Sequence, residues 1–214
     1  MELNRYIDHT LLKADAEPAD IIDLCNEACD YNFKSVCVNS GYTALASEQL
    51  KNTGIHICTV VGFPLGAMDS EVKAYEAKKA IENGADEIDM VINIGRLKAS
   101  DYEYVKEDIE KVFAQTKDKA ILKVIIEAGL LNEYEIMKVC QIIMKSGAEF
   151  VKTSTGFLGT GATVHDVSLI KGIVGDKLGI KASGGIRTKE DAIAMIEAGA
   201  SRLGTSKSIQ IVSE

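Results

Sequence analysis

The amino-acid sequence predicts an α/β protein folded as a single (β/α)8 barrel, the TIM barrel, over residues 1–214. Eight short runs rich in β-branched residues alternate with longer segments of helical period, as crossover-connected parallel strands require. One βα unit recurs along the chain, and the sequence holds only two prolines and no linker-like stretch. A closed barrel explains this pattern better than an open doubly wound sheet.

The strands are expected at the eight β-branched runs. The first run is short, so a helical amino-terminal segment is an alternative there. The expected strands are Ile7–Thr10, Ser35–Val38, Ile55–Val60, Glu87–Asn93, Ala120–Ile126, Phe150–Thr153, Gly179–Ala182 and Arg202–Thr205.

The intervening segments are expected to form helices that cover the outside of the barrel. Apolar side chains recur at helical spacing over 21–28 and over 136–143, which gives each helix one apolar face. The runs Asn132–Glu135 and Ser100–Glu103 each place a Glu three residues after a polar residue, and both therefore predict a capping box.

Three Gly-Ala dipeptides mark the points where a helix ends and a strand follows. They begin at Gly84, Gly147 and Gly199, and they constitute the internal repeat. A glycine at this point can adopt the left-handed conformation that ends many helices.

Composition excludes several functional classes. The 24 Lys and Arg residues against 32 Asp and Glu residues give a net charge of −8, the wrong sign for a nucleic-acid partner. No apolar run approaches the about 20 residues that cross a membrane, and the amino terminus lacks a signal-peptide pattern. We therefore expect a cytoplasmic protein with no membrane partner.

The cysteines and histidines form no recognisable metal-binding motif. Three histidines lie in separate segments, and no two cysteines show Cys-x-x-Cys spacing, so no metal is predicted, although distant residues can converge in a fold. Reduced core thiols are the expected state of all five cysteines, including Cys37 at the end of the second strand. The cysteines are Cys25, Cys29, Cys37, Cys58 and Cys140.

Three lysines lie late in apolar strands, near the carboxyl ends that form the active site of a barrel. They are Lys123, Lys152 and Lys181. A buried ammonium group is costly unless it is paired or loses its proton. Each lysine could reach past its strand to water or pair with a carboxylate, or the set could serve chemistry.

Lys152 and Lys181 lie on adjacent strands, roughly 4.8 Å apart, and could share one pocket. Two like charges there are expected to lower the pKa of at least one lysine. A neutral lysine is a nucleophile toward an aldehyde, which is the precondition for a Schiff base.

Two carboxylates accompany these lysines. Asp89 lies inside an apolar strand, where it can neutralise a lysine or act as a general acid or base, and these roles are compatible. Glu127, at the end of the fifth strand, is a less specific candidate, because it could merely hold Lys123.

Two glycine-rich turns follow the last two strands, over 183–187 and 204–208. Loops at this position, with exposed backbone N–H groups, recurrently bind phosphate in such barrels. Arg187 is more simply a solvated cation at a helix start. The loop 154–163 suits a flexible lip, and its hydroxyl groups could bind a polyol or cap the next helix. The expected phosphate-binding residues are Gly184, Gly185, Gly204, Thr205 and Ser206.

The segments Glu87–Asn93, Phe150–Phe157 and Lys181–Arg187 resemble the signature segments of the deoxyribose-phosphate aldolases, which are class I aldolases. The resemblance covers essentially the whole chain. It continues through the segments Tyr6–Leu12, Val60–Gly66 and Arg202–Ser206.

This resemblance implies reversible cleavage of 2-deoxy-D-ribose 5-phosphate into acetaldehyde and D-glyceraldehyde 3-phosphate, without metal or organic cofactor, by a homodimer. It also implies a place in deoxyribonucleotide catabolism. Within the resemblance, Lys152 matches the Schiff-base lysine, Lys181 matches the lysine that tunes its pKa, and Asp89 matches the acidic partner in proton transfer. The two glycine-rich turns match the phosphate-binding loops.

Two departures from the family pattern stand out. Lys207-Ser208 replaces a small residue and Gly, which could alter the phosphate geometry or add a cation to it. The chain also ends without the longer tyrosine-ending tail of some members, so turnover is expected to rely on Asp89, Lys181 and water.

Two other functions remain open at this point. A sugar-phosphate isomerase or decarboxylase would use the same turns and employ lysine and carboxylate only for proton transfer. A non-catalytic metabolite-binding barrel would use the lysines only to neutralise anions.

Overall fold

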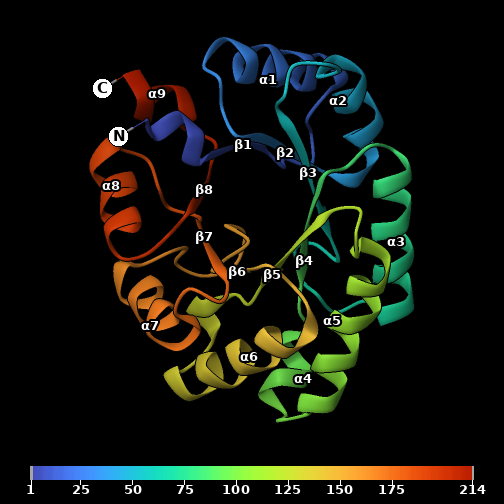
Figure 1. The fold of residues 1–214 in the computed structure, drawn as a ribbon, viewed down its shortest axis with the longest axis vertical. Coiled ribbons are helices and arrows are strands. Elements are labelled where there is room, and N and C mark those ends of the chain that lie inside the picture. The colour runs from blue at the N-terminus through green and yellow to red at the C-terminus, as the bar shows by residue number, and fades with distance from the viewer. Residues whose placement is uncertain (1, 214) are drawn as a thin grey trace.

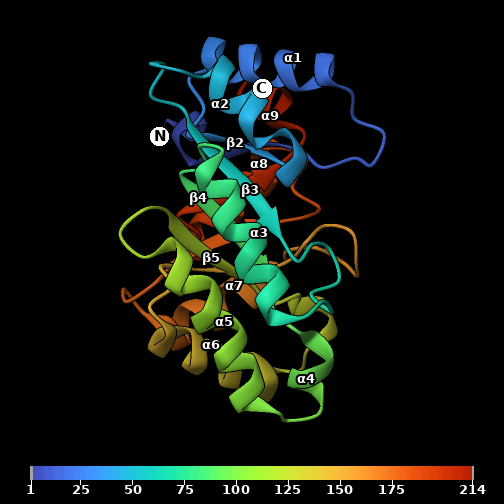
Figure 2. The ribbon, with the colours of Figure 1, turned by 90° about the vertical axis from the view of Figure 1, so that its right-hand side faces the viewer.

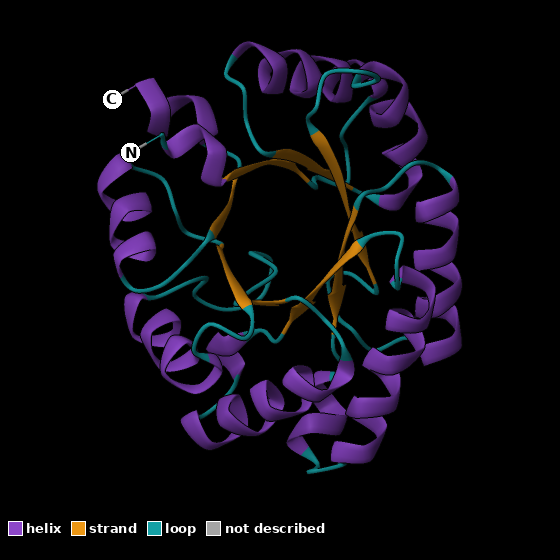
Figure 3. Cartoon of the chain, in the orientation of Figure 1, coloured by secondary structure: helices purple, strands orange, loops and turns teal. Residues whose placement is uncertain are grey.

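The computed structural model describes residues 2–213 and contains a closed barrel of eight parallel strands (Figures 1 and 3). Each strand pairs with the next along the chain, and the eighth pairs with the first. The strands are β1 (Ile7–Leu11), β2 (Ser35–Val38), β3 (His56–Val61), β4 (Glu87–Val91), β5 (Ile121–Ile125), β6 (Phe150–Lys152), β7 (Gly179–Ser183) and β8 (Arg202–Thr205).

The predicted barrel and its eight strands are confirmed, with ends that differ from expectation by at most two residues. The alternative of a helical segment at the first run is wrong, because Ile7–Leu11 form a strand. A 3-10 helix, η1, covers Leu3–Tyr6, and β1 follows directly.

The α-helices lie outside the ring of strands and cover its outer face (Figure 3). None of the helices within residues 2–213 is long and apolar enough to span a membrane. The helices are α1 (Pro18–Asp30), α2 (Thr43–Gln49), α3 (Ser70–Glu82), α4 (Ile94–Lys98), α5 (Tyr102–Thr116), α6 (Glu133–Ser146), α7 (Val164–Val174), α8 (Lys189–Glu197) and α9 (Ser208–Ser213), with the 3-10 turns η2 (Ser40–Tyr42) and η3 (Ala128–Leu130).

The expected apolar faces of α1 and α6 are buried. Every predicted stripe residue is at most 5% exposed, and each stripe packs into the main core. The stripe residues are Ile21, Leu24, Cys25 and Ala28 in α1, and Ile136, Val139, Cys140 and Ile143 in α6.

One of the two predicted capping boxes forms. The Asn132 side chain accepts from the Glu135 N–H, and the Glu135 carboxylate accepts from the Asn132 N–H. The prediction at Ser100 is wrong, because Asp101 caps α5 by accepting from the Tyr104 N–H. Ser100 instead has φ of 59° just after α4 ends, so it belongs to the turn between the two helices.

The helix-ending glycines behave as predicted. Gly84, Gly147 and Gly199 have φ of 97°, 91° and 118°. A Cβ atom at Gly147 would lie 2.4 Å from the Phe113 ring, so the close packing of α5 also requires a glycine there.

All five cysteines are free thiols, and four of them are buried. The expectation of a core position is wrong for Cys29, which is exposed. Cys29 follows Ala28, the last residue of the buried α1 stripe, and one helical step of about 100° turns it away from the barrel. Cys37 is fully buried, as expected.

An ion pair between α3 and α5 ties the outer layer to β4. These helices lie side by side outside the barrel (Figures 1 and 2). The Lys73 ammonium donates to Asp108 at 2.6 Å and to the carbonyl of Val91 at 2.9 Å, and the two side chains are fully buried. Since Val91 ends β4, this pair fixes the strand that carries Asp89.

We expect Lys73→Met to lower the free energy of unfolding by about 3–5 kcal/mol, because it leaves the Asp108 carboxylate buried without its partner. Urea unfolding measures the change. The double variant Lys73→Met/Asp108→Leu removes both charges and is expected to recover most of the loss. Equal destabilisation of the single and double variants would contradict this role of the ion pair.

Candidate active site

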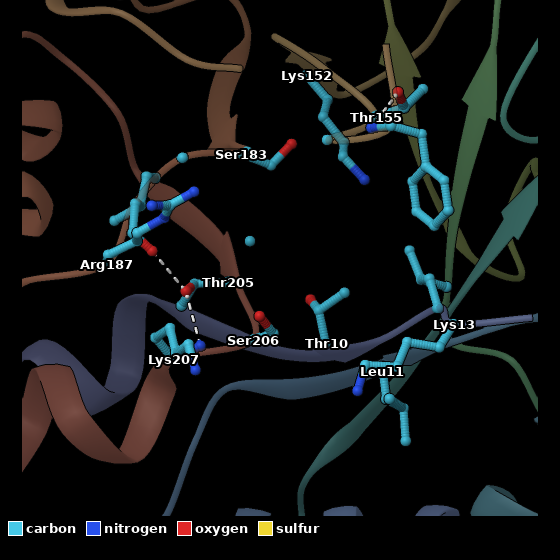
Figure 4. A pocket seen from close by; sticks show the side chains of 17 residues that line it. Thr10, Leu11, Lys13, Lys152, Thr155, Ser183, Arg187, Thr205, Ser206 and Lys207 are labelled. Carbon is cyan, nitrogen blue, oxygen red and sulfur yellow. Dashed lines mark hydrogen bonds between the residues drawn. The ribbon is translucent and has the colours of Figure 1, made fainter. Parts of the chain in front are cut away.

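A cavity of about 460 Å³ opens at the carboxyl ends of the strands, among the residues that follow β1, β6, β7 and β8. Lys152, the last residue of β6, points into it (Figure 4). All five predicted phosphate-binding residues also line this cavity. The structure therefore brings the reactive-lysine candidate and both glycine-rich turns together.

Below the cavity, Asp89 binds all three strand lysines. Its Oδ1 atom accepts a hydrogen bond from Lys123 Nζ at 2.8 Å. Its Oδ2 atom accepts from Lys152 Nζ at 2.8 Å and from Lys181 Nζ at 2.7 Å. The predicted pairing of Asp89 with a lysine is thus confirmed, and it involves the whole set.

Three further charged residues complete this buried network. The Arg202 guanidinium binds Asp8 and Glu87, with Nε to Asp8 Oδ1 at 2.8 Å and Nη2 to Glu87 Oε2 at 2.7 Å. Asp8 also pairs with Lys181, and Glu87 also pairs with Lys123. The network therefore holds four cations and three carboxylates, all at most 5% exposed.

Strand register explains why these side chains meet. Asp89 lies opposite Lys123 in the pairing of β4 with β5, and Lys152 lies opposite Lys181 in the pairing of β6 with β7. Alternate residues of a barrel strand point inward, so charged residues at matching levels converge on the barrel axis.

The carboxylates set the electrostatics of the network. Burial alone raises the pKa of Asp89, but Lys123, Lys152 and Lys181 outweigh it and hold the pKa well below its usual value. Asp89 is therefore ionised at neutral pH.

The expectation that crowding would lower the pKa of a lysine is wrong for Lys181. Burial lowers the pKa of Lys181, but Asp8 and Asp89 outweigh burial, and the pKa lies well above its usual value. Repulsion between the neighbouring ammonium groups is outweighed because the carboxylate of Asp8, from the first strand, also pairs with Lys181.

Lys152 is the one network lysine that lines the cavity, whereas Lys123 and Lys181 are fully buried beneath it. Its only carboxylate partner among the described residues is Asp89. Lys181 and Lys123 each pair with more than one carboxylate. Geometry thus distinguishes Lys152 as the reachable amine and Lys181 as a permanently paired cation.

The sequence had allowed Glu127 to pair with Lys123, but the structure shows a different partner for Glu127. Its Oε2 atom accepts from the N–H of Thr155 at 3.1 Å and from the Thr155 hydroxyl at 2.5 Å. Lys123 pairs instead with Glu87 and Asp89.

The two glycine-rich turns meet on one side of the cavity. Gly184 and Gly185 have φ of 83° and 81°, a conformation that other residues rarely adopt. In the second turn, the Thr205 hydroxyl donates to the carbonyl of Ile186 at 2.8 Å and accepts from the Lys207 N–H at 3.0 Å (Figure 4). Thr205 therefore links the two turns to each other.

Arg187 lies at a helix start, as expected, and it also lines the cavity. Its backbone N–H donates to Asp191 in α8, which fits a helix-start residue, and its side chain is exposed. It nevertheless lines the cavity beside the glycine-rich turns, as do Lys13 and Lys207. Three cationic residues therefore line the cavity that contains the two glycine-rich turns.

Sequence reasoning missed several residues of the site. Thr10 and Lys13 line the cavity from the end of β1 and the loop after it, and Asp8 and Arg202 belong to the buried network. For Asp8 and Arg202 the available signal was a charged residue inside a strand, the same signal that identified Asp89, whereas Thr10 and Lys13 carry no such signal.

Groups of metal-ligand type do converge inside the barrel. The thiols of Cys37 and Cys58 and the Asp89 carboxylate lie within 4.8 Å of one another. The same carboxylate already accepts from three ammonium groups, and their positive charge opposes a metal cation.

Comparison with known proteins agrees with this geometry. Residues 3–206 match the family described as DeoC/LacD family aldolase. A deoxyribose-phosphate aldolase of Finegoldia magna is 62% identical over 212 residues, 99% of each chain. One of Clostridium novyi is 58% identical over 212 residues, 99% of this chain and 96% of that one. The solved deoxyribose phosphate aldolase of Aeropyrum pernix, described as a unique tetramer, superposes with a TM-score of 0.93 at 34% identity, covering 99% of this chain and 89% of that one.

The buried network predicts acid sensitivity. Burial raises the pKa of Glu87, but Lys123, His56 and Arg202 outweigh it and hold the pKa of Glu87 well below its usual value. Stability from such a carboxylate is fully present above the unfolded-state pKa of about 4.3 and is lost as the pH falls through the lower folded-state value.

We therefore expect Glu87→Gln to lower the free energy of unfolding by roughly 3 kcal/mol at pH 7. The difference in free energy of unfolding between the variant and the parent should become smaller below about pH 4. In that range the unfolded parent binds a proton at Glu87, whereas the folded parent does not. Urea unfolding between pH 7 and pH 3 measures this, with the exposed Glu103→Gln as a matched control. If this difference in free energy of unfolding did not change with pH, the charge of Glu87 would contribute nothing to stability.

Proposed function

This chain belongs to the DeoC/LacD family of aldolases, and on that premise we propose that it cleaves 2-deoxy-D-ribose 5-phosphate through a Schiff base on Lys152. The products are acetaldehyde and D-glyceraldehyde 3-phosphate, and the reaction is reversible. One observation carries the assignment of the lysine: Lys152 alone among the network lysines reaches the cavity.

The ion pairs of the network support Lys152 as the reactive amine. Four cationic side chains, Lys123, Lys152, Lys181 and Arg202, share three carboxylates. Lys152 pairs with Asp89 alone among the described carboxylates, whereas Lys123 and Lys181 each pair with more than one. Lys152 is therefore the network lysine held by the fewest ion pairs.

The chemistry requires an electron sink next to the bond that breaks. The Lys152 amine attacks the C1 carbonyl carbon of the open-chain sugar, and loss of water gives an iminium ion. Removal of the C3 hydroxyl proton then cleaves the C2–C3 bond, and the electron pair moves into an enamine. Protonation of C2 and hydrolysis release acetaldehyde and restore the amine.

We assign Asp89 to charge stabilisation at Lys152 and, together with water, to proton transfer. The ionised Asp89 carboxylate lies 2.8 Å from Lys152 Nζ, so it faces the positive charge of the iminium nitrogen. Lys181 donates to the same oxygen atom and keeps that carboxylate ionised. Proton transfer at the substrate then passes through Asp89 and water, while Lys181 stays a fixed cation beneath the cavity.

We assign the phosphate group to the two glycine-rich turns. Backbone N–H groups at Gly184, Gly185 and Gly204 can approach an anion closely, and Thr205 and Ser206 add hydroxyl groups. Lys207 lines the same cavity, which supports an added cation as the effect of this departure from the family pattern.

The homodimer and the cytoplasmic location stay proposals. The tetramer belongs to the description of the Aeropyrum pernix protein. Sedimentation equilibrium of the purified chain and fractionation of cells address the two proposals.

Treatment with acetaldehyde and borohydride is expected to leave one reduced ethyl adduct, on the peptide that holds Lys152. The Lys152→Arg variant should form no adduct and should lose turnover by about 10⁴-fold or more, because a guanidinium cannot form the imine. Mass spectrometry of the digest and an assay of glyceraldehyde 3-phosphate release give the two results.

Lys119→Arg is the matched control for this substitution, because Lys119 is exposed and precedes β5 at the opposite end of the strand. It should form the adduct like the parent protein. An adduct on another peptide would refute the assignment of Lys152. Phosphate-ester binding without any adduct would favour the isomerase or decarboxylase, and ligand binding that survives in Lys152→Arg without turnover in the parent would favour a metabolite-binding barrel.

A further inference from the structure

Glu127 occupies an unusual backbone position at the end of β5. Its φ is 53°, in the left-handed region, which costs a residue other than glycine about 1–3 kcal/mol. On one side of it, the Ile126 N–H donates to the carbonyl of Lys152. On the other side, the Ala128 N–H donates to the carbonyl of Thr153. Glu127 is therefore an extra residue, a bulge between β5 and the segment that carries Lys152.

The Glu127 carboxylate makes its hydrogen bonds to one residue. Its Oε2 atom accepts both the N–H and the hydroxyl of Thr155, and its Oε1 atom has no hydrogen-bond partner within residues 2–213. The side chain is fully buried. Burial raises the pKa of Glu127, and the bonds from Thr155 and the charge of Lys152 act against that rise. The protein thus tolerates both a strained backbone and a buried carboxylate at Glu127, and the hydrogen bonds that this carboxylate makes go to Thr155.

This contact fixes the direction of the Thr155 hydroxyl. A hydroxyl group has one hydrogen and two lone pairs. The hydrogen goes to Glu127 at 2.5 Å, and one lone pair accepts from the Phe157 N–H at 3.1 Å. One lone pair remains. Thr155 lines the cavity beside Lys152 (Figure 4), so toward the cavity its hydroxyl can only accept a hydrogen bond.

We propose that Glu127 is a positioning residue that makes Thr155 an acceptor for a hydroxyl group of the substrate. The inference rests on the proposed function, in which the substrate is a hydroxyl-bearing sugar phosphate. The turn after β5 also lies close to the far end of the same loop, because a Cβ atom at Gly129 would lie 3.2 Å from the hydroxyl of Thr160.

This arrangement distinguishes two kinds of substrate. A sugar phosphate can donate a hydroxyl hydrogen to Thr155, whereas acetaldehyde carries no hydroxyl group. Loss of the Glu127 contact should therefore weaken sugar cleavage and leave imine formation with acetaldehyde unaffected.

The test compares Glu127→Leu, Thr155→Val, the double variant and Glu127→Gln. Each single variant, Glu127→Leu or Thr155→Val, should lower kcat/KM for 2-deoxy-D-ribose 5-phosphate by about 10- to 100-fold. The double variant should be within about twofold of Thr155→Val, because both changes remove the same interaction. Glu127→Gln supplies a carbonyl oxygen in place of Oε2 and should stay within about threefold of the parent. Glu133→Gln, an exposed position on α6, is the matched control.

Losses that multiply in the double variant would overturn the proposal, as would parent-like cleavage by Glu127→Leu. If Glu127→Gln lost as much as Glu127→Leu, the charge of the carboxylate would be required, and positioning would be refuted. Should Glu127→Leu fail to fold, Glu127→Ala takes its place in the comparison, with the same expected loss. Borohydride trapping of acetaldehyde on Lys152 is run on every variant. Its absence in the parent would refute the proposed function, whereas its presence with unaffected cleavage would refute only the role of Glu127.

Discussion

Charged side chains inside this barrel must neutralise one another, because they are almost wholly removed from solvent. Four cations and three carboxylates lie between the strands, and each is within ion-pair distance of at least one group of opposite charge. A carboxylate or ammonium group left alone there would cost several kcal/mol. Asp89 is at the centre of this arrangement because three lysines share its two oxygen atoms.

The closed sheet determines which of these charged groups a substrate can reach. Lys123 and Lys181 are held below the floor of the cavity, while Lys152, at the last position of β6, extends into it. The network therefore presents one amine to a substrate and keeps the others as fixed charges. Glycine-rich turns after β7 and β8 bound the same cavity, so the strands fix where Lys152 and the proposed phosphate-binding turns lie relative to each other.

Local sequence pattern was sufficient to predict the eight strands and the buried helix faces, because the strands are short β-branched runs buried on both sides and the helix faces follow from apolar residues at helical spacing. The carboxyl-end rule likewise located Lys152 and the two turns. Side-chain pairs between strands that are distant in the sequence could not be predicted from local pattern. Asp8 meets Lys181 only because β8 closes on β1, and Glu127 meets Thr155 only because a bulge turns it. The misplaced cap at Ser100 has a similar cause, since Asp101 competes for the same role one residue later.

The account depends on Lys152 reacting while Asp89 still faces its nitrogen. A crystal structure of the protein reduced with borohydride in the presence of 2-deoxy-D-ribose 5-phosphate tests this most directly. We expect continuous electron density from Lys152 Nζ into the cavity, with an Asp89 oxygen within hydrogen-bond distance of that nitrogen. Density on a different lysine, or a modified Lys152 that has moved out of contact with Asp89, would contradict the account.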